Sequence, residues 1–364
     1  MIHRRKLLKS LDRIIGGVLV RFFSLRKNAP PQKPSAEIRA VLIIRPGGMG
    51  DAVLLIPMLR ALKARFPLAT IHVLAERRNA EIFGWLSELV ATVFCYDHGL
   101  DLLRALAQRY DLVIDTEQWY RLSAVIARLI RAKTRTGFST NERGNLFNIP
   151  VPYDQNRYEA ENFLSLLEAL TGKPAAFDPD APFLTFTDVG KRKEKTILIA
   201  PGASYREKQW TLEKFRQLTK SLLDHGYAVG LIGGPTDVGQ AASLAEALPL
   251  QNFVGRKTLR ETAGLIASAG LVIGGDSVAL HLAAALGTPS IALFGPTPPK
   301  QWAPRGRLHR TLYHPPACSP CSRFGHIPPC PYDVDCLKRI TVEEVQGAVQ
   351  EIMTGDSKAT RSSI

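Results

Sequence analysis

Short apolar runs alternate with longer amphipathic stretches along most of the chain. Buried-strand patterns occur at residues 40–45, 71–75, 92–96 and 112–115, and again at 196–200, 228–232, 271–273 and 290–294. Helical periodicity follows, most clearly over residues 51–66, 212–225 and 342–353. This alternation of strands and helices predicts an α/β protein built on doubly wound parallel sheets.

The pattern also predicts two domains. Residues 173–195 are rich in Pro, Asp and Lys and lack a sustained period, which is typical of an inter-domain linker. The chain has 364 residues, whereas single cores stop growing near roughly 250–300. We therefore expect an N-terminal domain over residues 37–175, a C-terminal domain over 190–340 and a terminal helix over 341–353.

Residues 1–36 read as a basic amphipathic helix and a linker. They hold nine Lys and Arg against one Asp, so +8 of the net charge of +14 lies here. Apolar residues recur at helical spacing between Leu7 and Phe23, but the longest stretch without charge, residues 14–20, is far shorter than the roughly 20 residues that span a bilayer. No signal-peptide pattern is present either, which predicts a cytoplasmic protein.

Two interpretations of this basic helix remain open. In the first, the helix is peripheral and lies on the anionic inner face of the cytoplasmic membrane. Alternatively, it docks on its own domain or on a second copy of the chain. Nucleic-acid binding is disfavoured, because the basic residues lie on an apolar-faced helix without interleaved stacking residues.

The first Gly-rich turn follows the strand pattern at residues 40–45. Gly47, Gly48 and Gly50 allow the backbone to approach a ligand closely. Asp51 either caps the following helix or takes part in the chemistry. With Glu76 after the next strand, the turn partly matches a dinucleotide-binding fingerprint, although Val53 occupies the third glycine position. An NAD-dependent oxidoreductase is therefore one alternative function.

The second Gly-rich turn, residues 274–281, lies between a buried strand and a helix that runs to Leu286. Asp276 or Ser277 would cap this helix, whose first amides and His281 suit a pyrophosphate. In the loop at residues 202–210, Lys208 is placed to neutralise a diphosphate. Trp210, in the same loop, is expected to be core.

Three motifs together resemble glycosyltransferase family 9, the lipopolysaccharide heptosyltransferases and their relatives. They are PGGMGD at residues 46–51, GASYREKQW at 202–210 and GGDSVALHLAAALGTPSIALFGPT at 274–297. The resemblance covers roughly residues 38–353. It implies a GT-B fold, in which two Rossmann-like domains face a cleft with the acceptor on the N-terminal side and the nucleotide sugar held mainly by the C-terminal domain.

The resemblance also implies roles for individual residues. Asp51 would be the base of an inverting reaction that needs no metal, and Gly47, Gly48 and Gly50 would form the acceptor-side loop. Lys208 would contact phosphate, and Asp237 is a weaker match to an acidic ribose contact. The segment that would bind the nucleotide diphosphate comprises Asp276, Ser277, Val278, Ala279 and His281.

The implied activity is transfer of a heptose from ADP-heptose to the lipopolysaccharide core or another lipid-linked saccharide. One physical tension accompanies the base assignment. An aspartate at a helix N-terminus is stabilised as its anion, which makes it a weaker base, and burial on domain closure is one way to compensate.

Four cysteines form a cluster within a loop at residues 314–336. Their spacing, Cys318-x2-Cys321-x8-Cys330-x5-Cys336, permits a structural zinc, although the second pair is wider than in well-formed zinc sites. Disulfides and free structural thiols are the alternatives, and a catalytic metal is not expected. The loop and the basic helix also leave a third function open, a non-catalytic binding protein docked on a membrane.

Overall fold

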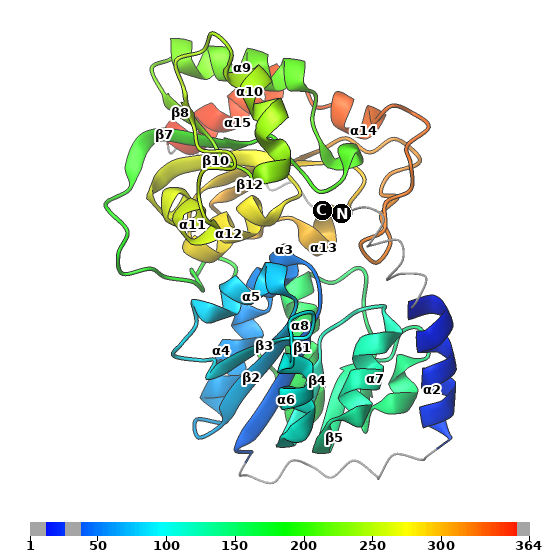
Figure 1. Cartoon of the computed structure of the whole chain (residues 1–364). Coiled ribbons are helices and arrows are strands. Elements are labelled where there is room, and N and C mark those ends of the chain that lie inside the picture. Colours follow the sequence, from blue (N-terminus) through cyan, green and yellow to red (C-terminus); the bar gives the residue numbers. More distant parts are fainter. Residues whose placement is uncertain (1–11, 26–37, 355–364) are drawn as a thin grey trace. The chain divides into compact units, whose positions relative to one another are not determined.

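The computed structural model describes residues 12–25 and 38–354. The chain folds as two compact units that meet in sequence at Phe177 and Asp178, inside the stretch expected to be a linker (Figure 1). The predicted basic helix is described only from Asp12, so its first turns lie outside the described residues.

The first unit contains a six-stranded sheet in the order β3-β2-β1-β4-β5-β6. Every neighbouring pair is parallel. The strands are β1 (Ala40–Arg45), β2 (Thr70–Ala75), β3 (Thr92–Cys95), β4 (Arg109–Asp115), β5 (Arg131–Phe138) and β6 (Ile149–Val151). Strands β2 and β3 are added on one side of β1, and β4 to β6 on the other, so the strand order reverses between β1 and β4. In open α/β sheets, ligands bind at the carboxyl ends of the strands at such a switch point.

Helices cover both faces of this sheet. They are α3 (Met49–Leu54), α4 (Ile56–Arg65), α5 (Arg77–Gly84), α6 (Asp101–Ala107), α7 (Arg121–Leu129), α8 (Glu159–Thr171) and the 3-10 turn η2 (Arg143–Leu146). Helices α6 and α7 share one core with β1 and β4, whereas α4 packs on α8. The single helix predicted over residues 51–66 is instead two helices. Pro57 has no N–H to bond the preceding turn, and the break at Leu55 lies just before it.

The N-terminal segment docks on its own unit. It consists of a π-helical turn, η1 (Asp12–Gly16), and α2 (Gly17–Ser24), which lies beside α7 (Figure 1). Asp12 is buried and its Oδ1 accepts a hydrogen bond of 2.8 Å from the backbone N–H of Leu122. Val20 is fully buried, whereas Phe22 on the outer face is 61% exposed. One face of the helix is therefore core and the other remains apolar and open.

The second unit repeats the topology of the first. Its parallel sheet has the order β12-β11-β10-β7-β8-β9. The strands are β7 (Lys193–Ala200), β8 (Ala228–Leu231), β9 (Gln251–Asn252), β10 (Ala269–Gly275), β11 (Ser290–Phe294) and β12 (His309–Tyr313). Both sheets therefore follow the Rossmann strand order 3-2-1-4-5-6, and the predicted fold class, two doubly wound Rossmann-like domains as in GT-B proteins, is confirmed.

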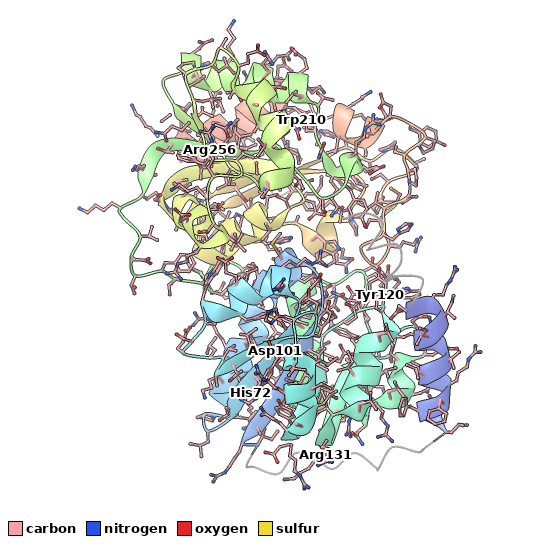
Figure 2. The ribbon with its side chains drawn as sticks, in the orientation of Figure 1. His72, Asp101, Tyr120, Arg131, Trp210 and Arg256 are labelled. Atoms are coloured by element: carbon pink, nitrogen blue, oxygen red, sulfur yellow. The ribbon has the colours of Figure 1, made fainter. Side chains whose placement is uncertain are left out.

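The helices of the second unit complete two layers around its sheet. They are α9 (Leu212–Asp224), α10 (Val238–Ala245), α11 (Leu259–Ser268), α12 (Val278–Leu286), α13 (Pro299–Trp302), α14 (Asp335–Lys338) and α15 (Val342–Thr354), with the 3-10 turns η3 (Arg206–Lys208) and η4 (Pro235–Asp237). Helices α9, α10 and α15 share one core, and α11 packs on α12. Trp210, labelled in Figure 2, belongs to that core, as predicted. Its Nε1 donates to the carbonyl of Ile340. Among helices of the described segments, none has the length and apolarity to cross a bilayer.

Candidate active site

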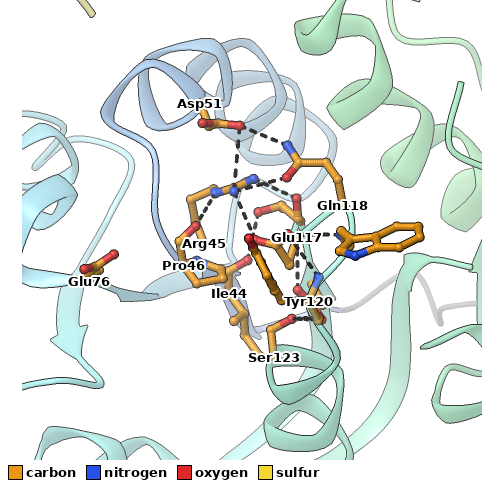
Figure 3. Close-up of polar contacts among 12 residues, drawn as sticks. Ile44, Arg45, Pro46, Asp51, Glu76, Glu117, Gln118, Tyr120 and Ser123 are labelled. Carbon is orange, nitrogen blue, oxygen red and sulfur yellow. Dashed lines mark hydrogen bonds and ion pairs between the residues drawn. The ribbon is translucent and has the colours of Figure 1, made fainter. Parts of the chain in front are cut away.

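Asp51 lies at the switch point of the first sheet, in the first turn of α3. Its Oδ1 accepts a hydrogen bond of 2.9 Å from Gln118 Nε2 and is 3.7 Å from Arg45 Nη2. Figure 3 shows both side chains pointing toward the carboxylate. The Asp51 side chain is 19% exposed, whereas that of Arg45 is 3% exposed. The structure thus holds the predicted base in place while leaving it partly accessible.

Arg45 ties the end of β1 to the segment that follows β4. Its Nη1 donates to the carbonyl of Thr116 at 2.8 Å, and its Nη2 lies 3.4 Å from Glu117 Oε2. Burial by itself lowers the pKa of Arg45, but the carboxylates of Asp51, Glu117, Glu159 and Asp115 together outweigh it, so that the pKa is raised. A permanent positive charge therefore lies beneath Asp51.

Glu117 is the second carboxylate of this cluster. Burial raises its pKa, and this effect exceeds the opposing influence of Arg45 and Arg143. Its Oε1 accepts a hydrogen bond of 3.0 Å from the backbone N–H of Trp119. Neither Arg45, Glu117 nor Gln118 was predicted as a site residue. The sequence offered one signal for these residues, namely that polar residues stand at the ends of two buried-strand patterns.

Steric contacts explain why the first turn contains glycines. A Cβ on Gly48 would lie 1.9 Å from Asp51 Oδ2, so any side chain there would displace the carboxylate. Gly47 has φ +88°, and a Cβ there would lie 3.2 Å from Arg78 Nη2. Gly50 lies in the first turn of α3. These glycines shape the Asp51 turn, and their predicted contact with an acceptor stays a prediction.

Glu76, the residue behind the oxidoreductase alternative, serves its own helix. It is the N-cap of α5, its backbone N–H donates to Asn79 Oδ1 at 3.0 Å, and its Oε2 accepts from Arg78 Nε at 2.8 Å. In Figure 3 it lies apart from the cluster around Asp51. This is a capping arrangement, which accounts for an acid at this position without a ribose.

In the second unit, Lys208 and Asp276 form an ion pair at the carboxyl edge of the sheet. Lys208 Nζ lies 2.5 Å from Asp276 Oδ2, and His281 Nε2 lies 3.8 Å from Oδ1. Burial raises the pKa of Asp276, but Lys208 and His281 together outweigh burial and hold it well below its usual range. Three residues predicted from two separate motifs are therefore brought together.

Two glycines explain how this pair is assembled. A Cβ on Gly275 would lie 2.6 Å from the carbonyl oxygen of Lys208, and one on Gly274 would lie 2.9 Å from that of Ala200. Only glycine lets the end of β10 approach the turn η3 this closely. The paired glycines thus set Lys208 against the N-terminus of α12.

Three buried polar atoms at this edge have no hydrogen-bond partner: Ser277 Oγ, His281 Nδ1 and Thr297 Oγ1. Ser277 is the N-cap of α12 but makes no side-chain cap bond, and Val278 and Ala279 follow it in the first turn. Buried polar atoms in native proteins are almost always bonded. Together with the helix N-terminus, these orphans indicate a site for a polar, anionic ligand. Thr297 was not among the predicted residues.

Asp237 has a local role in the structure. Its Oδ2 accepts a hydrogen bond of 2.9 Å from the backbone N–H of Gly234. A Cβ on Gly202 would lie 2.2 Å from its Cγ, so the carboxyl group packs directly on the turn after β7. Asp237 thus joins the turns after β7 and β8, and its contact with a ribose stays a prediction.

All four cysteines of the loop at residues 314–336 line one small pocket and are free thiols. Burial, with a smaller contribution from the neighbouring thiols Cys330, Cys321 and Cys318, raises the pKa of Cys336 to about 11. Within residues 12–25 and 38–354, however, no three or more His, Cys, Asp or Glu side chains are arranged to hold a metal ion.

Comparison with known proteins agrees with this geometry. Residues 100–328 match glycosyltransferase family 9 (heptosyltransferase). Lipopolysaccharide heptosyltransferase 3 of Escherichia coli is 30% identical over 293 residues, which are 70% of this chain and 83% of that protein. Lipooligosaccharide heptosyltransferase 2 of Haemophilus influenzae is 27% identical over 297 residues, or 72% and 85% of the two chains.

Solved structures share the fold. The E. coli heptosyltransferase WaaC with ADP-2-deoxy-2-fluoro heptose superposes with a TM-score of 0.69 at 21% identity, covering 86% of this chain and 99% of that one. Fold and site together define a nucleotide-sugar glycosyltransferase. This chain belongs to glycosyltransferase family 9, the heptosyltransferases.

Proposed function

We propose that this protein is an inverting, metal-independent enzyme that transfers a heptose from ADP-heptose to the lipopolysaccharide core or another lipid-linked saccharide. The observation that carries the proposal is the anion site of the second unit, where Lys208 meets unpartnered polar atoms at the N-terminus of α12. The names of the similar proteins, and the ADP-sugar analogue in the WaaC structure, support heptose and ADP as sugar and carrier.

In this proposal the second unit holds the donor. The diphosphate accepts hydrogen bonds from the first backbone amides of α12, at Val278 and Ala279, and from the Ser277 hydroxyl. Lys208 and His281 supply further donors, and Asp276 keeps the Lys208 ammonium at the site. Such groups stabilise negative charge as it develops on the leaving group, without reorganising during the reaction.

The first unit supplies the base. Asp51 accepts the proton of an acceptor hydroxyl, whose oxygen bonds to the anomeric carbon while the bond from that carbon to the phosphate oxygen breaks. ADP leaves with the electron pair, and attack opposite to it inverts the anomeric configuration. Gly47, Gly48 and Gly50 shape the turn on which the acceptor would lie.

Metal independence follows from the charge that the protein itself provides. Lys208 and the positive end of the α12 dipole supply positive charge where the diphosphate would lie. Chelators should therefore leave turnover unchanged.

We also propose that the protein works at the inner surface of the cytoplasmic membrane. The outer face of η1 and α2 is apolar, with Ile14, Val18 and Phe22 each more than 60% exposed, and Arg13 and Arg21 are exposed beside them. In sequence, further cations flank the helix on both sides. An apolar face bordered by cations suits an anionic lipid surface, where a lipid-linked acceptor would be found.

The structural zinc remains a proposal for the Cys318, Cys321, Cys330 and Cys336 loop. The shared pocket of the four thiols supports it, whereas their described arrangement does not form a metal site. Elemental analysis of purified protein decides between the alternatives. One zinc per chain, lost on substitution of Cys321 by Ser, supports the site, whereas no metal with all thiols titratable contradicts it.

The other two functions lack support. The family match is to glycosyltransferases, and Glu76 is occupied in capping α5 rather than facing the Asp51 turn.

Product analysis tests the proposed reaction. Mass spectrometry of a heptose-deficient lipopolysaccharide acceptor incubated with ADP-heptose should show the gain of one heptose, with inverted configuration by NMR. No gain of mass with any heptose-deficient acceptor, despite firm ADP binding, would contradict heptose transfer but keep a nucleotide-sugar site.

A further inference from the structure

The side-chain amide of Gln118 lies between two carboxylates. Its Nε2 donates to Asp51 Oδ1 at 2.9 Å and to Glu159 Oε1 at 2.7 Å, while its Oε1 accepts from Arg45 Nη2 at 3.4 Å. An amide nitrogen has two hydrogens, so it can donate a hydrogen bond to each carboxylate at the same time. Because the oxygen faces a guanidinium, the amide has one favourable orientation.

Glu159 is held as firmly as the amide it contacts. It is the first residue of α8 and fully buried. Tyr153 Oη donates to its Oε2 at 2.6 Å, and Asn162 Nδ2 donates to the same oxygen at 3.2 Å. Burial and the neighbouring Glu159 raise the pKa of Tyr153, so the phenol stays a neutral donor. The carboxylate of Glu159 is thus a fixed point for Gln118.

We propose that Glu159, acting through Gln118, is a positioning residue that orients Asp51. The inference rests on the proposed role of Asp51 in glycosyl transfer. It assigns a function to two residues that belong to none of the three sequence motifs.

Charged groups surround this bridge. The buried guanidinium of Arg45 faces the carboxylates of Asp51, Glu117, Glu159 and Asp115, and the buried Arg143 pairs with Asp115 at 2.7 Å. From α5, Arg78 lies beside Gly47, but it is paired with Glu76.

The bridge through Gln118 fixes the orientation of the Asp51 carboxylate. The hydrogen bond from Gln118 engages Oδ1, so the acceptor hydroxyl would meet Oδ2, which lies above Gly48. A base displaced by about 1 Å can lose roughly 100-fold in rate. Loss of Glu159 would free the amide to turn and Asp51 to follow it.

The test is the pH profile of kcat for Glu159→Gln, with ADP-heptose and a heptose-deficient lipopolysaccharide acceptor. We expect kcat to fall about 10- to 100-fold. The acidic limb should move to lower pH by roughly half a unit to one unit, because one negative charge is removed. The KM for ADP-heptose should change less than about two-fold, since the donor residues lie in the other unit.

Glu88→Gln is the matched control. It makes the same charge change on an exposed carboxylate of the same unit, which lies 3.9 Å from Arg60 Nη2. Its profile should match the wild type. An unchanged acidic limb in Glu159→Gln, with kcat within two-fold of wild type, would overturn the inference.

A second variant covers the case in which Glu159→Gln does not fold, as judged by circular dichroism and ADP titration. Tyr153→Phe removes one hydrogen bond to Glu159 without changing charge. It should lower kcat about three- to ten-fold and leave the acidic limb in place. Full kcat in a folded Tyr153→Phe protein would count against positioning by Glu159.

The outcomes separate this inference from the function on which it rests. An inactive wild type, or an Asp51→Asn variant with full turnover, removes the proposed function and the inference together. An active wild type and an inactive Asp51→Asn variant, with a Glu159→Gln profile like that of wild type, remove the inference alone.

Discussion

At the scale of single residues, the two polar clusters differ in how well they are satisfied. Around Asp51 the Gln118 amide, the Arg45 guanidinium and the neighbouring carboxylates bond to one another, although Asn162 Oδ1 and Arg143 Nε at the edge of the cluster lack partners. At the start of α12, Ser277, His281 and Thr297 keep buried atoms without partners. The first cluster is therefore organised before any substrate arrives, whereas the second is completed by its ligand.

Two threonines turn this difference into a prediction. Thr297→Val should weaken ADP binding about five- to ten-fold and cost no stability, because its hydroxyl bonds to nothing in the protein. Thr288→Val is the matched control, since its buried hydroxyl donates to the carbonyl of Ile266 at 2.9 Å. It should lower the unfolding free energy by about 1 kcal/mol and leave ADP affinity unchanged. Calorimetric titration and urea unfolding measure both, and equal ADP affinities for the two variants would contradict the assignment of Thr297.

A second residue-scale prediction concerns pH. Burial lowers the pKa of His309 to about 4, and its Nδ1 lies 2.9 Å from Ser290 Oγ. The unfolded chain, with an ordinary value near 6.5, takes up the proton first, so stability is full above about pH 6.5 and falls toward pH 4. His309→Gln should reduce the decrease in Tm between about pH 6.5 and about pH 4. His225→Gln, on an exposed histidine, should keep the wild-type slope, and identical slopes for all three proteins would speak against the buried neutral His309.

The residues of the site were only partly predictable from sequence. Asp51, Lys208, Asp276 and His281 lie in motifs whose glycines and helix starts have a physical meaning, and the structure brings the last three together. Gln118 and Glu159 are separated from Asp51 by 67 and 108 positions in sequence, and no local pattern signals such a bridge. Only the sheet order brings the three together.

At the scale of elements, the burial of a strand determined whether it could be predicted from the sequence. Strands such as β1, β10 and β11 are apolar runs and were predicted. Strand β5 reads RAKTRTGF and β12 reads HRTLY, so their polar and charged residues hid them. Strand β12 is an edge strand, which needs less apolar surface than a central one.

The helix α2 gives the element-scale prediction. If its outer face binds anionic membranes, Phe22→Asp should lower partitioning into vesicles that contain phosphatidylglycerol by about ten-fold or more. Leu68→Asp is the matched control, since Leu68 is 73% exposed elsewhere in the same unit. Sedimentation with anionic and zwitterionic vesicles measures the effect. Equal binding by both variants, or a wild type that dimerises through α2 instead, would contradict the membrane surface.

At the scale of the whole molecule, one topology is used twice for two tasks. Each unit places its polar cluster at the carboxyl edge of a sheet with strand order 3-2-1-4-5-6. In our account the second unit binds the charged leaving group, and the first prepares the nucleophile. Family membership and this duplicated topology were predictable from motifs and periodicity, because both depend on glycine turns and apolar runs.

The most direct test of the central claim is release of ADP by the purified protein given ADP-heptose and a heptose-deficient lipopolysaccharide acceptor, with EDTA present. The account predicts release that requires the acceptor and persists in EDTA. It also predicts that Asp51→Asn loses about 100-fold or more in turnover while ADP affinity stays within two-fold. Release that continues unchanged in Asp51→Asn, or that stops on chelation, would contradict it.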